Sequence, residues 1–374
     1  MSAMTQLLQA MVQKQASDLF FTAGAPVGIK VAGVVHPIAM SDLSAEGIKQ
    51  MAYELMDAES IRQFEARNEL NFGYSQEDVG RFRVNLYRQR GSVAMVIRRL
   101  SSTVSDLAEL GLSPILGRLA LEKHGLILVV GASGSGKSTT MAAMIEHRNA
   151  NSSGHILTVE DPIEFVYQRK RSVISQREIG ADTESYDSAL VNALREAPDM
   201  IMIGETRDRQ TMQHVIDYAN TGQLCLSSLH AINSHQALTR IVNFFPLEQR
   251  NTILFDLAAC LVAIVAQRLV PTVDGRRVVA LEIFVADPSM QKLIREGRLD
   301  EIKQRMEEHL MGEAQTFDQA LAQLYRDGRI SYEVAEDNAD SPRQFHLLIH
   351  GEQPAVQSAI GELPPLPGGL PGAN

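Results

Sequence analysis

The sequence predicts an α/β protein in which a mostly parallel sheet, wrapped by helices, follows a smaller α+β domain. Short apolar runs alternate with helical segments in the middle of the chain, a pattern typical of buried parallel strands. The runs are Leu126–Val130, His155–Val159, Met200–Ile203 and Leu224–Ser228. The first hundred residues instead mix amphipathic helices with strands of alternating polarity, and 374 residues are enough for two domains.

The best-defined strand of the N-terminal region is the run 81–87, RFRVNLY. Its apolar residues alternate strictly with polar ones, so we expect the apolar set to face a core and Arg83 to lie on the opposite face. The other expected elements are helices over 5–15 and after Ser44, and strands over 29–35 and 92–98.

Composition changes along the chain predict its organisation. We expect a domain over 1–100, a short polar linker over 101–106, a nucleotide-binding core over 107–286, a charged helical region over 287–345, and a flexible Pro/Gly-rich tail over 346–374. The most apolar run, 257–265, is read as a buried helix, because it is far shorter than the roughly 20 residues that span a bilayer.

Charge and cysteine content restrict the classes of function. The formal net charge is −10, which gives no global basic field for holding nucleic acid or an anionic membrane. The two cysteines, Cys225 and Cys260, lie in apolar stretches and are expected to be buried reduced thiols. The N-terminus has no secretion signal, so we expect a cytoplasmic protein.

The motif GASGSGKST, directly after an apolar run, predicts a phosphate-binding loop. Its glycines let the backbone turn its N–H groups inward, and the following helix adds partial positive charge. Lys137 can reach the outer phosphates, and the Ser138 hydroxyl can bind Mg²⁺. The predicted cofactor-binding residues are Gly131, Ala132, Ser133, Gly134, Ser135, Gly136, Lys137, Ser138 and Thr139.

Three further strand ends carry polar side chains. VEDPIEF places Glu160, Asp161 and Glu164 after one strand, MIMIGE ends in Glu205 like a Walker B segment, and LCLSSLH ends in His230. Each has a plain structural alternative, since loop carboxylates are often only solvated and a lone histidine is more often structural than catalytic.

Taken in order with GASGSGKST, the segments VEDPIEF, ALREAPDMIMIGETRD and TGQLCLSSLH resemble the Asp box, Walker B segment and His box of the secretion ATPase superfamily. GRFRVN, NFFP, IVAQRL and FDQAL extend the resemblance to about residues 1–345. Within the superfamily the chain looks most like the type IV pilus retraction ATPases of the PilT/PilU family, especially the PilU type. The long N-terminal extension and four-cysteine zinc motif of the assembly ATPases are missing.

The resemblance implies a hexameric ring that binds ATP and Mg²⁺ between a PAS-like N-terminal domain and a RecA-like C-terminal domain. It implies that Glu164 activates water, that Glu205 supports Mg²⁺ or that water, and that His230 senses the γ-phosphate. It also implies that Glu160 and Asp161 are among the residues that bind the nucleotide cofactor.

The resemblance also implies a group of arginines that respond to the charge on the transferred phosphate. Arg83 and Arg98 match those that the N-terminal domain presents to the nucleotide, and Arg195 and Arg207 flank the Walker B strand. Two positions depart from the family pattern. Gln223 replaces a histidine, so a proton-linked role is not expected at that position, and Val262 replaces an arginine, so a subunit contact of the family is lost or replaced there.

The expected function is therefore a Mg²⁺-dependent ATPase motor that powers pilus retraction and twitching motility. It would act on an inner-membrane pilus platform protein as an accessory to a PilT-type ATPase, and would associate peripherally with that membrane. Two alternative functions are a regulatory protein of pilus or type II secretion that binds ATP with little turnover, and a RecA-like nucleic-acid motor. The net charge disfavours the second.

Overall fold

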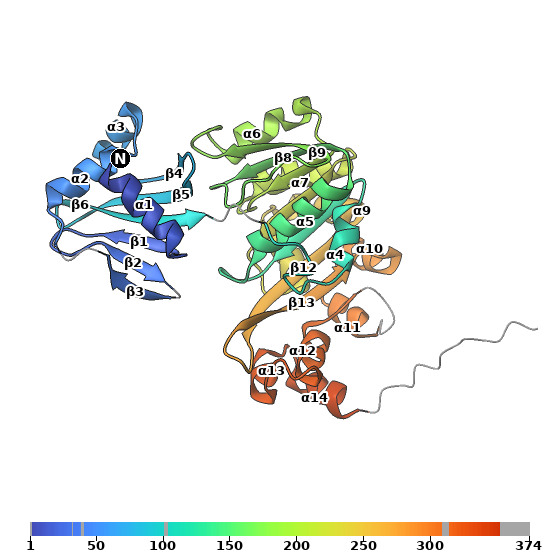
Figure 1. Cartoon of the computed structure of the whole chain (residues 1–374). Helices are drawn as coiled ribbons and strands as arrows, with labels where there is room; N and C mark the ends of the chain where they lie inside the picture. Colours follow the sequence, from blue (N-terminus) through green and yellow to red (C-terminus); the bar gives the residue numbers. More distant parts are fainter. Residues whose placement is uncertain (1, 32, 39–40, 101–103, 309–313, 352–374) are drawn as a thin grey trace, which may run out of the picture.

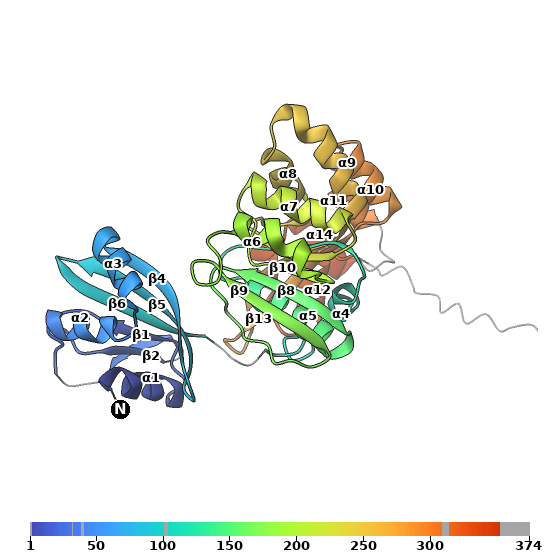
Figure 2. The same ribbon diagram turned by 90° about the horizontal axis from the view of Figure 1, so that it is seen from above.

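The computed structural model describes residues 2–31, 33–38, 41–100, 104–308 and 314–351. Its strands form two separate sheets, which lie beside each other in both views (Figure 1, Figure 2). We call residues 2–100 the N-terminal module and residues 104–351 the C-terminal module. The chain is thus built from α and β elements throughout, as the sequence predicts.

The N-terminal module has a six-stranded antiparallel sheet in the order β3-β2-β1-β6-β5-β4. Its elements are α1 (Ala3–Gln13), β1 (Asp18–Phe21), β2 (Gly28–Val31), β3 (Val34–Pro37), α2 (Ala45–Tyr53), α3 (Ala58–Arg67), β4 (Glu69–Gln76), β5 (Gly80–Gln89) and β6 (Ser92–Leu100).

The local sequence accounts for these elements. Ser44 begins α2 by accepting a hydrogen bond from the Gly47 N–H, as expected of a helix cap. Phe82, Val84 and Leu86 of β5 are at most 1% exposed, so the predicted alternation is confirmed. The single strand expected over 29–35 is wrong, because the structure has the hairpin β2–β3 there.

The C-terminal module has a seven-stranded sheet in the order β13-β12-β7-β11-β10-β8-β9. All neighbours are parallel except β12 and β13. Its elements are α4 (Ile115–Ala120), β7 (Gly125–Val130), α5 (Lys137–Asn151), β8 (Gly154–Glu160), β9 (Ser172–Glu178), α6 (Tyr186–Ala193), η1 (Leu194–Glu196), β10 (Met200–Ile203), α7 (Arg209–Asn220), β11 (Leu224–Leu229), α8 (Ser234–Asn243), η2 (Leu247–Gln249), α9 (Arg250–Cys260), β12 (Leu261–Pro271) and β13 (Arg277–Val285).

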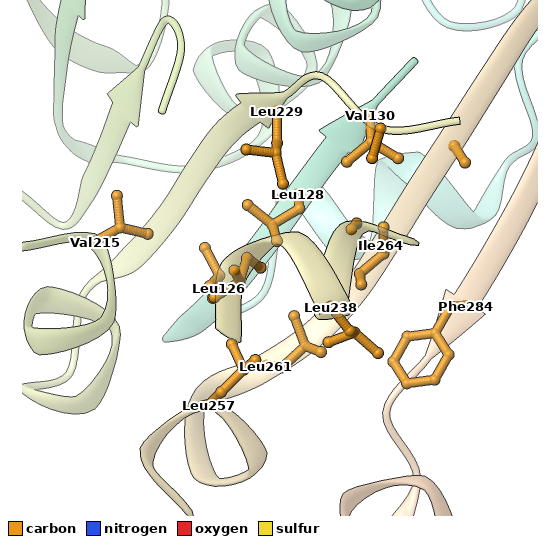
Figure 3. Packing of buried hydrophobic residues seen from close by; sticks show 14 of the residues in the cluster. Leu126, Leu128, Val130, Val215, Leu229, Leu238, Leu257, Leu261, Ile264 and Phe284 are labelled. Carbon is orange, nitrogen blue, oxygen red and sulfur yellow. The ribbon is translucent and has the colours of Figure 1, made fainter. Parts of the chain in front are cut away.

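The main core lies on both faces of this sheet. Leu126, Leu128 and Val130 of β7 pack into one hydrophobic cluster, and the alternate residues Ile127 and Val129 pack into another. Figure 3 shows the first cluster, in which β7 meets side chains from neighbouring strands and helices. A strand buried on both faces reads as an unbroken apolar run, which explains why the sequence pattern identified β7.

The helix expected over 257–265 is partly wrong. The helix α9 ends at Cys260, and Leu261 begins β12, which pairs with β7 on one side and β13 on the other. The β-branched residues Val262, Ile264 and Val265 favour a strand here. Both cysteines are buried and free, as predicted.

Five helices follow the sheet: α10 (Pro288–Arg295), α11 (Glu301–Glu308), α12 (Phe317–Arg326), α13 (Tyr332–Asn338) and α14 (Pro342–His350). They bear out the helical character expected of this region, but α14 continues past the point at which the flexible tail was expected to begin. The rest of that tail, 352–374, and residues 101–103 of the expected linker lie outside the described residues. Among the described helices, none is long and apolar enough to cross a membrane.

The two modules touch where β4 and β5 of the N-terminal sheet meet β9, the edge strand of the other sheet. Arg81 on β5 donates a hydrogen bond of 2.8 Å to Glu178 at the end of β9. Gly73 on β4 lies opposite the same carboxylate, and a Cβ there would come within 2.6 Å of Glu178 Oε1. A larger residue at this position would have to displace the Glu178 carboxylate. The contact between the modules places the polar face of β5 toward the carboxyl ends of the parallel strands.

Candidate functional site

The phosphate-binding loop predicted from the sequence joins β7 to α5. A Cβ at Gly131 would lie 2.4 Å from Ser135 Oγ and 2.7 Å from the Gln267 carbonyl oxygen, so only glycine fits this close turn. Gly136 precedes α5 with φ of 91°, and no side chain caps the helix. The first N–H groups of α5 are therefore available to an anion, with the helix dipole behind them.

Lys137 lies at the start of α5. Its Nζ donates 3.0 Å hydrogen bonds to the carbonyl oxygens of Gly131 and Ala132, which hold it over the loop. Burial lowers the pKa of Lys137, although the carboxylates of Glu205 and Glu164 act in the opposite direction. A lysine in this setting gains more from a bound phosphate than from water.

The predicted strand-end residues Glu160, Glu205 and His230 follow the neighbouring strands β8, β10 and β11, as expected for one edge of a parallel sheet. Glu205 accepts a 2.8 Å hydrogen bond from Arg207 and lies 3.0 Å from His230 Nε2. Burial raises the pKa of Glu205, but Arg207, His230 and Lys137 outweigh it, so the net shift is downward. Glu205 is thus held in place by its partners and favours the charged form.

Glu160 is a different kind of carboxyl group. It is 6% exposed, and Oε1 accepts hydrogen bonds from Thr158 at 2.7 Å and Gln176 at 3.2 Å. Burial raises the pKa of Glu160 to about 7, against the effect of these bonds. Glu160 therefore sits near its titration point at neutral pH.

That loop carries Asp161 and Glu164, both exposed. Asp161 lies 3.9 Å from Arg207. The side chain of Glu164 has no hydrogen bond or ion pair in the part of the chain that the structure describes. The loop is anchored between them, because the Ile163 N–H donates to Glu178, the same carboxylate that binds Arg81 of the N-terminal module.

These groups line one cavity of about 800 Å³ between the two modules. From the C-terminal module come residues of the phosphate loop with the strand-end carboxylates, His230 and Arg207, and from the N-terminal module come Arg83 and Arg98. The predicted residues that line it are Ser133, Gly134, Gly136, Lys137, Ser138, Thr139, Glu160, Asp161, Glu164, Glu205, Arg207, His230, Arg83 and Arg98. The charge pattern is that of a site for a strongly anionic ligand with cations on both sides.

Other predicted positions lie elsewhere. Arg195, on the exposed η1 turn, donates a 3.4 Å hydrogen bond to Asn192, its one side-chain partner among the described residues, and does not line the cavity. Gln223 precedes β11, whereas His230 follows it, so the two lie at opposite ends of the strand. Val262 lies in β12 with its Cγ2 against Gly125.

Sequence reasoning missed Gln267 and Arg277. Gln267 is 2% exposed on β12, and its amide donates a 2.6 Å hydrogen bond to the Ser135 carbonyl inside the phosphate loop. Arg277 lines the cavity from β13. Gln267 lies in the segment IVAQRL, but that segment gives it no chemical role, and Arg277 belongs to no motif. The pairing of β12 with β7 and with β13 brings both residues to the loop.

A second cavity of about 800 Å³ shares Gly136, Thr139, Leu269 and Arg277 with the first. It is lined by both β12 and β13 and contains Gln267, whose buried Oε1 has no hydrogen-bond partner within the described structure. The two cavities therefore meet at the first turn of α5. The second cavity has a mixed lining, with apolar side chains such as Leu110 and Val279 and charged ones such as Arg277.

Comparison with known proteins assigns the chain to a family. The family model described as "Type II/IV secretion system protein" matches residues 1–296. The chain belongs to this family. It is 48% identical to the type IV pilus ATPase PilU of Pseudomonas aeruginosa, over 92% of this chain and 90% of the relative. It is 36% identical to the type IV pilus retraction ATPase PilT of the same organism, over 91% of this chain and 99% of the relative.

Solved structures agree with this assignment. The crystal structure of the pilus retraction motor PilT with bound ADP matches with a TM-score of 0.87 and 36% identity, covering 92% of this chain and 99% of that one. The ATPase DotB of Legionella pneumophila matches with a TM-score of 0.79 and 27% identity, covering 89% and 94%. The predicted resemblance is thus confirmed, and the chain is an ATPase of the PilT/PilU type.

Proposed function

We propose that this chain hydrolyses ATP with Mg²⁺ and converts the energy into movement between its two modules, which powers type IV pilus retraction. One observation carries the proposal: a single cavity joins the lysine of the phosphate loop, four strand-end carboxyl groups and two arginines of the other module. Breaking a phosphate bond changes the charge that these opposed groups share, so hydrolysis changes the force between the modules.

The partners of the carboxylates support a division of roles. Glu205 is already engaged by Arg207 and His230, which suits a group that fixes the position of a metal ion or a water molecule. Glu164 faces the same cavity without a hydrogen bond or ion pair in the described structure, so it can accept a proton from an attacking water. His230, whose Nε2 lies 3.0 Å from Glu205 Oε1, would orient toward the terminal phosphate.

The donor set fits Mg²⁺. Mg²⁺ prefers oxygen ligands and keeps several waters when it is bound with substrate phosphates. Ser138 offers an exposed hydroxyl at the phosphate loop, and Glu205 offers a carboxylate across the cavity. Among the described residues no cluster of three or more His, Cys, Asp or Glu side chains could hold a metal alone, so the ion would depend on the phosphates. When bound, Mg²⁺ would neutralise charge that develops on them.

The second cavity would hold the nucleoside. It begins at Gly136 and Thr139, on the side of α5 away from the strand-end carboxylates, and its walls include apolar side chains such as Leu110 and Val279. A base and ribose need such a mixed lining, whereas the triphosphate needs the first cavity.

We further infer that the seven-stranded sheet is a RecA-like core, that the antiparallel sheet is PAS-like, and that six copies form a ring acting on an inner-membrane pilus platform. The TM-score to PilT supports the shared architecture. The higher identity to PilU than to PilT supports a PilU-type role beside a PilT partner. The protein would then work in the cytoplasm at the membrane.

Phosphate release by the purified full-length chain tests the central activity. A malachite-green assay should show release that needs both ATP and Mg²⁺ and that stops when EDTA is added. Tight ATP binding without Mg²⁺-dependent release would instead identify a regulatory binder. Strong stimulation by DNA would identify a nucleic-acid motor and overturn the pilus assignment.

The ring is tested separately by light scattering with and without a non-hydrolysable ATP analogue. A mass of six copies in the presence of the analogue supports the ring. A monomer in both conditions contradicts it while leaving the phosphate-release result intact.

A further inference from the structure

One cross-strand row of the N-terminal sheet faces the nucleotide cavity. Asp18 on β1 is the direct partner of Arg98 on β6, Arg98 is the partner of Arg83 on β5, and Arg83 is the partner of Gly73 on β4. Directly opposite residues of antiparallel strands project from the same face of a sheet. The two arginines of the proposed site are therefore immediate neighbours, with one acid beside them.

The row is electrostatically unbalanced. Like charges directly opposite each other on adjacent strands destabilise a sheet. Arg83 has no side-chain hydrogen bond or ion pair in the described part of the chain, and the only partner of the Arg98 guanidinium there is Asp18. Asp18 thus pairs with only one of the two guanidinium groups, and both arginines line the cavity.

The contact with Asp18 has a specific geometry. Arg98 Nε donates a 2.8 Å hydrogen bond to Asp18 Oδ1, and Ser17 Oγ donates 2.9 Å to Oδ2. The side chain of Asp18 is 5% exposed, whereas that of Arg98 is 63% exposed. The buried acid holds the inner nitrogen of the guanidinium and leaves both terminal nitrogens without a partner among the described residues.

We propose that Asp18 is a positioning residue for hydrolysis: it holds Arg98 by Nε, so that the terminal nitrogens of Arg98 are presented to the phosphates beside Arg83. A guanidinium fixed at Nε can still form a two-pronged contact with a phosphate through its outer nitrogens. Because Arg98 is already held in place, less side-chain conformational entropy is lost when the transition state forms. The inference rests on the proposed function, because it assigns Asp18 to the same site.

A double-mutant cycle tests it. Asp18→Ala should lower kcat for ATP hydrolysis about tenfold with a small change in KM, because the arginine acts mainly when charge develops on the phosphate. Arg98→Ala should cause a similar or larger loss. If Asp18 acts through Arg98, the double variant Asp18→Ala/Arg98→Ala should have the kcat of Arg98→Ala alone.

Two further variants separate positioning from folding. Asp18→Glu keeps the charge and should recover most of the lost kcat. Glu65→Ala removes an ion pair with Arg88, which lies on β5 but outside the cavity, and should leave kcat and KM unchanged. Melting temperatures are measured for all variants.

The outcomes are distinguishable. Losses that multiply in the double variant, or a fall in kcat that tracks the melting temperature and is not recovered by Asp18→Glu, would overturn the assignment of Asp18. Full turnover in Arg98→Ala would also overturn it. Absence of Mg²⁺-dependent turnover in the wild-type chain would overturn the proposed function itself, before any variant is compared.

Discussion

Arg83→Ala isolates the contribution of the N-terminal module to catalysis. Arg83 lines the cavity and has no side-chain partner in the described structure, so its removal breaks no hydrogen bond of the ligand-free chain. A hydrogen bond to a charged group contributes about 1.5–3 kcal/mol, and about 2 kcal/mol corresponds to a roughly 30-fold change in rate. Arg98 directly opposite can compensate in part, so we expect a loss in kcat of about 10- to 100-fold.

The same geometry predicts almost no cost in stability. Removing Arg83 relieves a like-charge pair with Arg98, so the melting temperature should fall by no more than about 2 °C or should rise. ATP affinity should change little, because the phosphate loop lies in the other module.

The assay compares kcat, KM and melting temperature for the wild type, Arg83→Ala and Arg88→Ala. Arg88 lies on the same strand but pairs with Glu65 outside the cavity, so its removal should leave turnover unchanged. Unchanged kcat in Arg83→Ala would refute the reasoning. Equal losses of kcat and thermal stability would show that Arg83 is structural.

Three further changes test other parts of the site. Lys137→Ala should weaken ATP binding by at least about 100-fold in calorimetry, because it removes a cation that is already held over the loop; unchanged affinity would contradict the phosphate site. The raised pKa of Glu160, about 7 against 4.5, means that the folded chain keeps a proton that the unfolded chain releases, so stability is lost as pH rises through that interval. Glu160→Gln should therefore reduce the fall in unfolding free energy between about pH 5 and about pH 8 by roughly 2–3 kcal/mol in urea titrations, and an unaltered pH profile would exclude a buried protonated Glu160. Glu178→Gln removes a charge-assisted bond to Arg81, so it should loosen the contact between the modules and increase hydrogen exchange in β5 but not in β7. Equal exchange in β5 of the wild type and of Glu178→Gln would show that this bond does not join the modules.

Much of the fold could be predicted because its strands carry strong local signals. The run at β7 is apolar on both faces, and in β5 apolar and polar residues alternate without a break. Each pattern therefore predicts which faces of its strand are buried. The hairpin β2–β3 and the start of β12 could not be placed in this way. A continuous apolar segment is compatible with helix or strand, and at Leu261 the partners β7 and β13 decide between them.

The residues of the site also fall into two groups, those that sequence motifs predict and those that only the fold reveals. Lys137, Glu205 and His230 follow strands at motif spacings with a chemical reason, and the structure brings them together. Asp18, Glu178 and Gln267 were missed because their importance comes from contacts with residues far away in the sequence. Asp18 in particular begins a four-residue strand whose sequence gives no sign that Arg98 lies opposite.

The contact of one nucleotide with both modules is the most direct test of the motor. It can be observed in a crystal structure of the full chain with Mg²⁺ and a non-hydrolysable ATP analogue. We predict that Lys137 and at least one of Arg83 and Arg98 lie within about 2.7–3.2 Å of phosphate oxygens of the same nucleotide. Phosphates bound by the loop alone in every copy, with both arginines turned into solvent, would contradict the account.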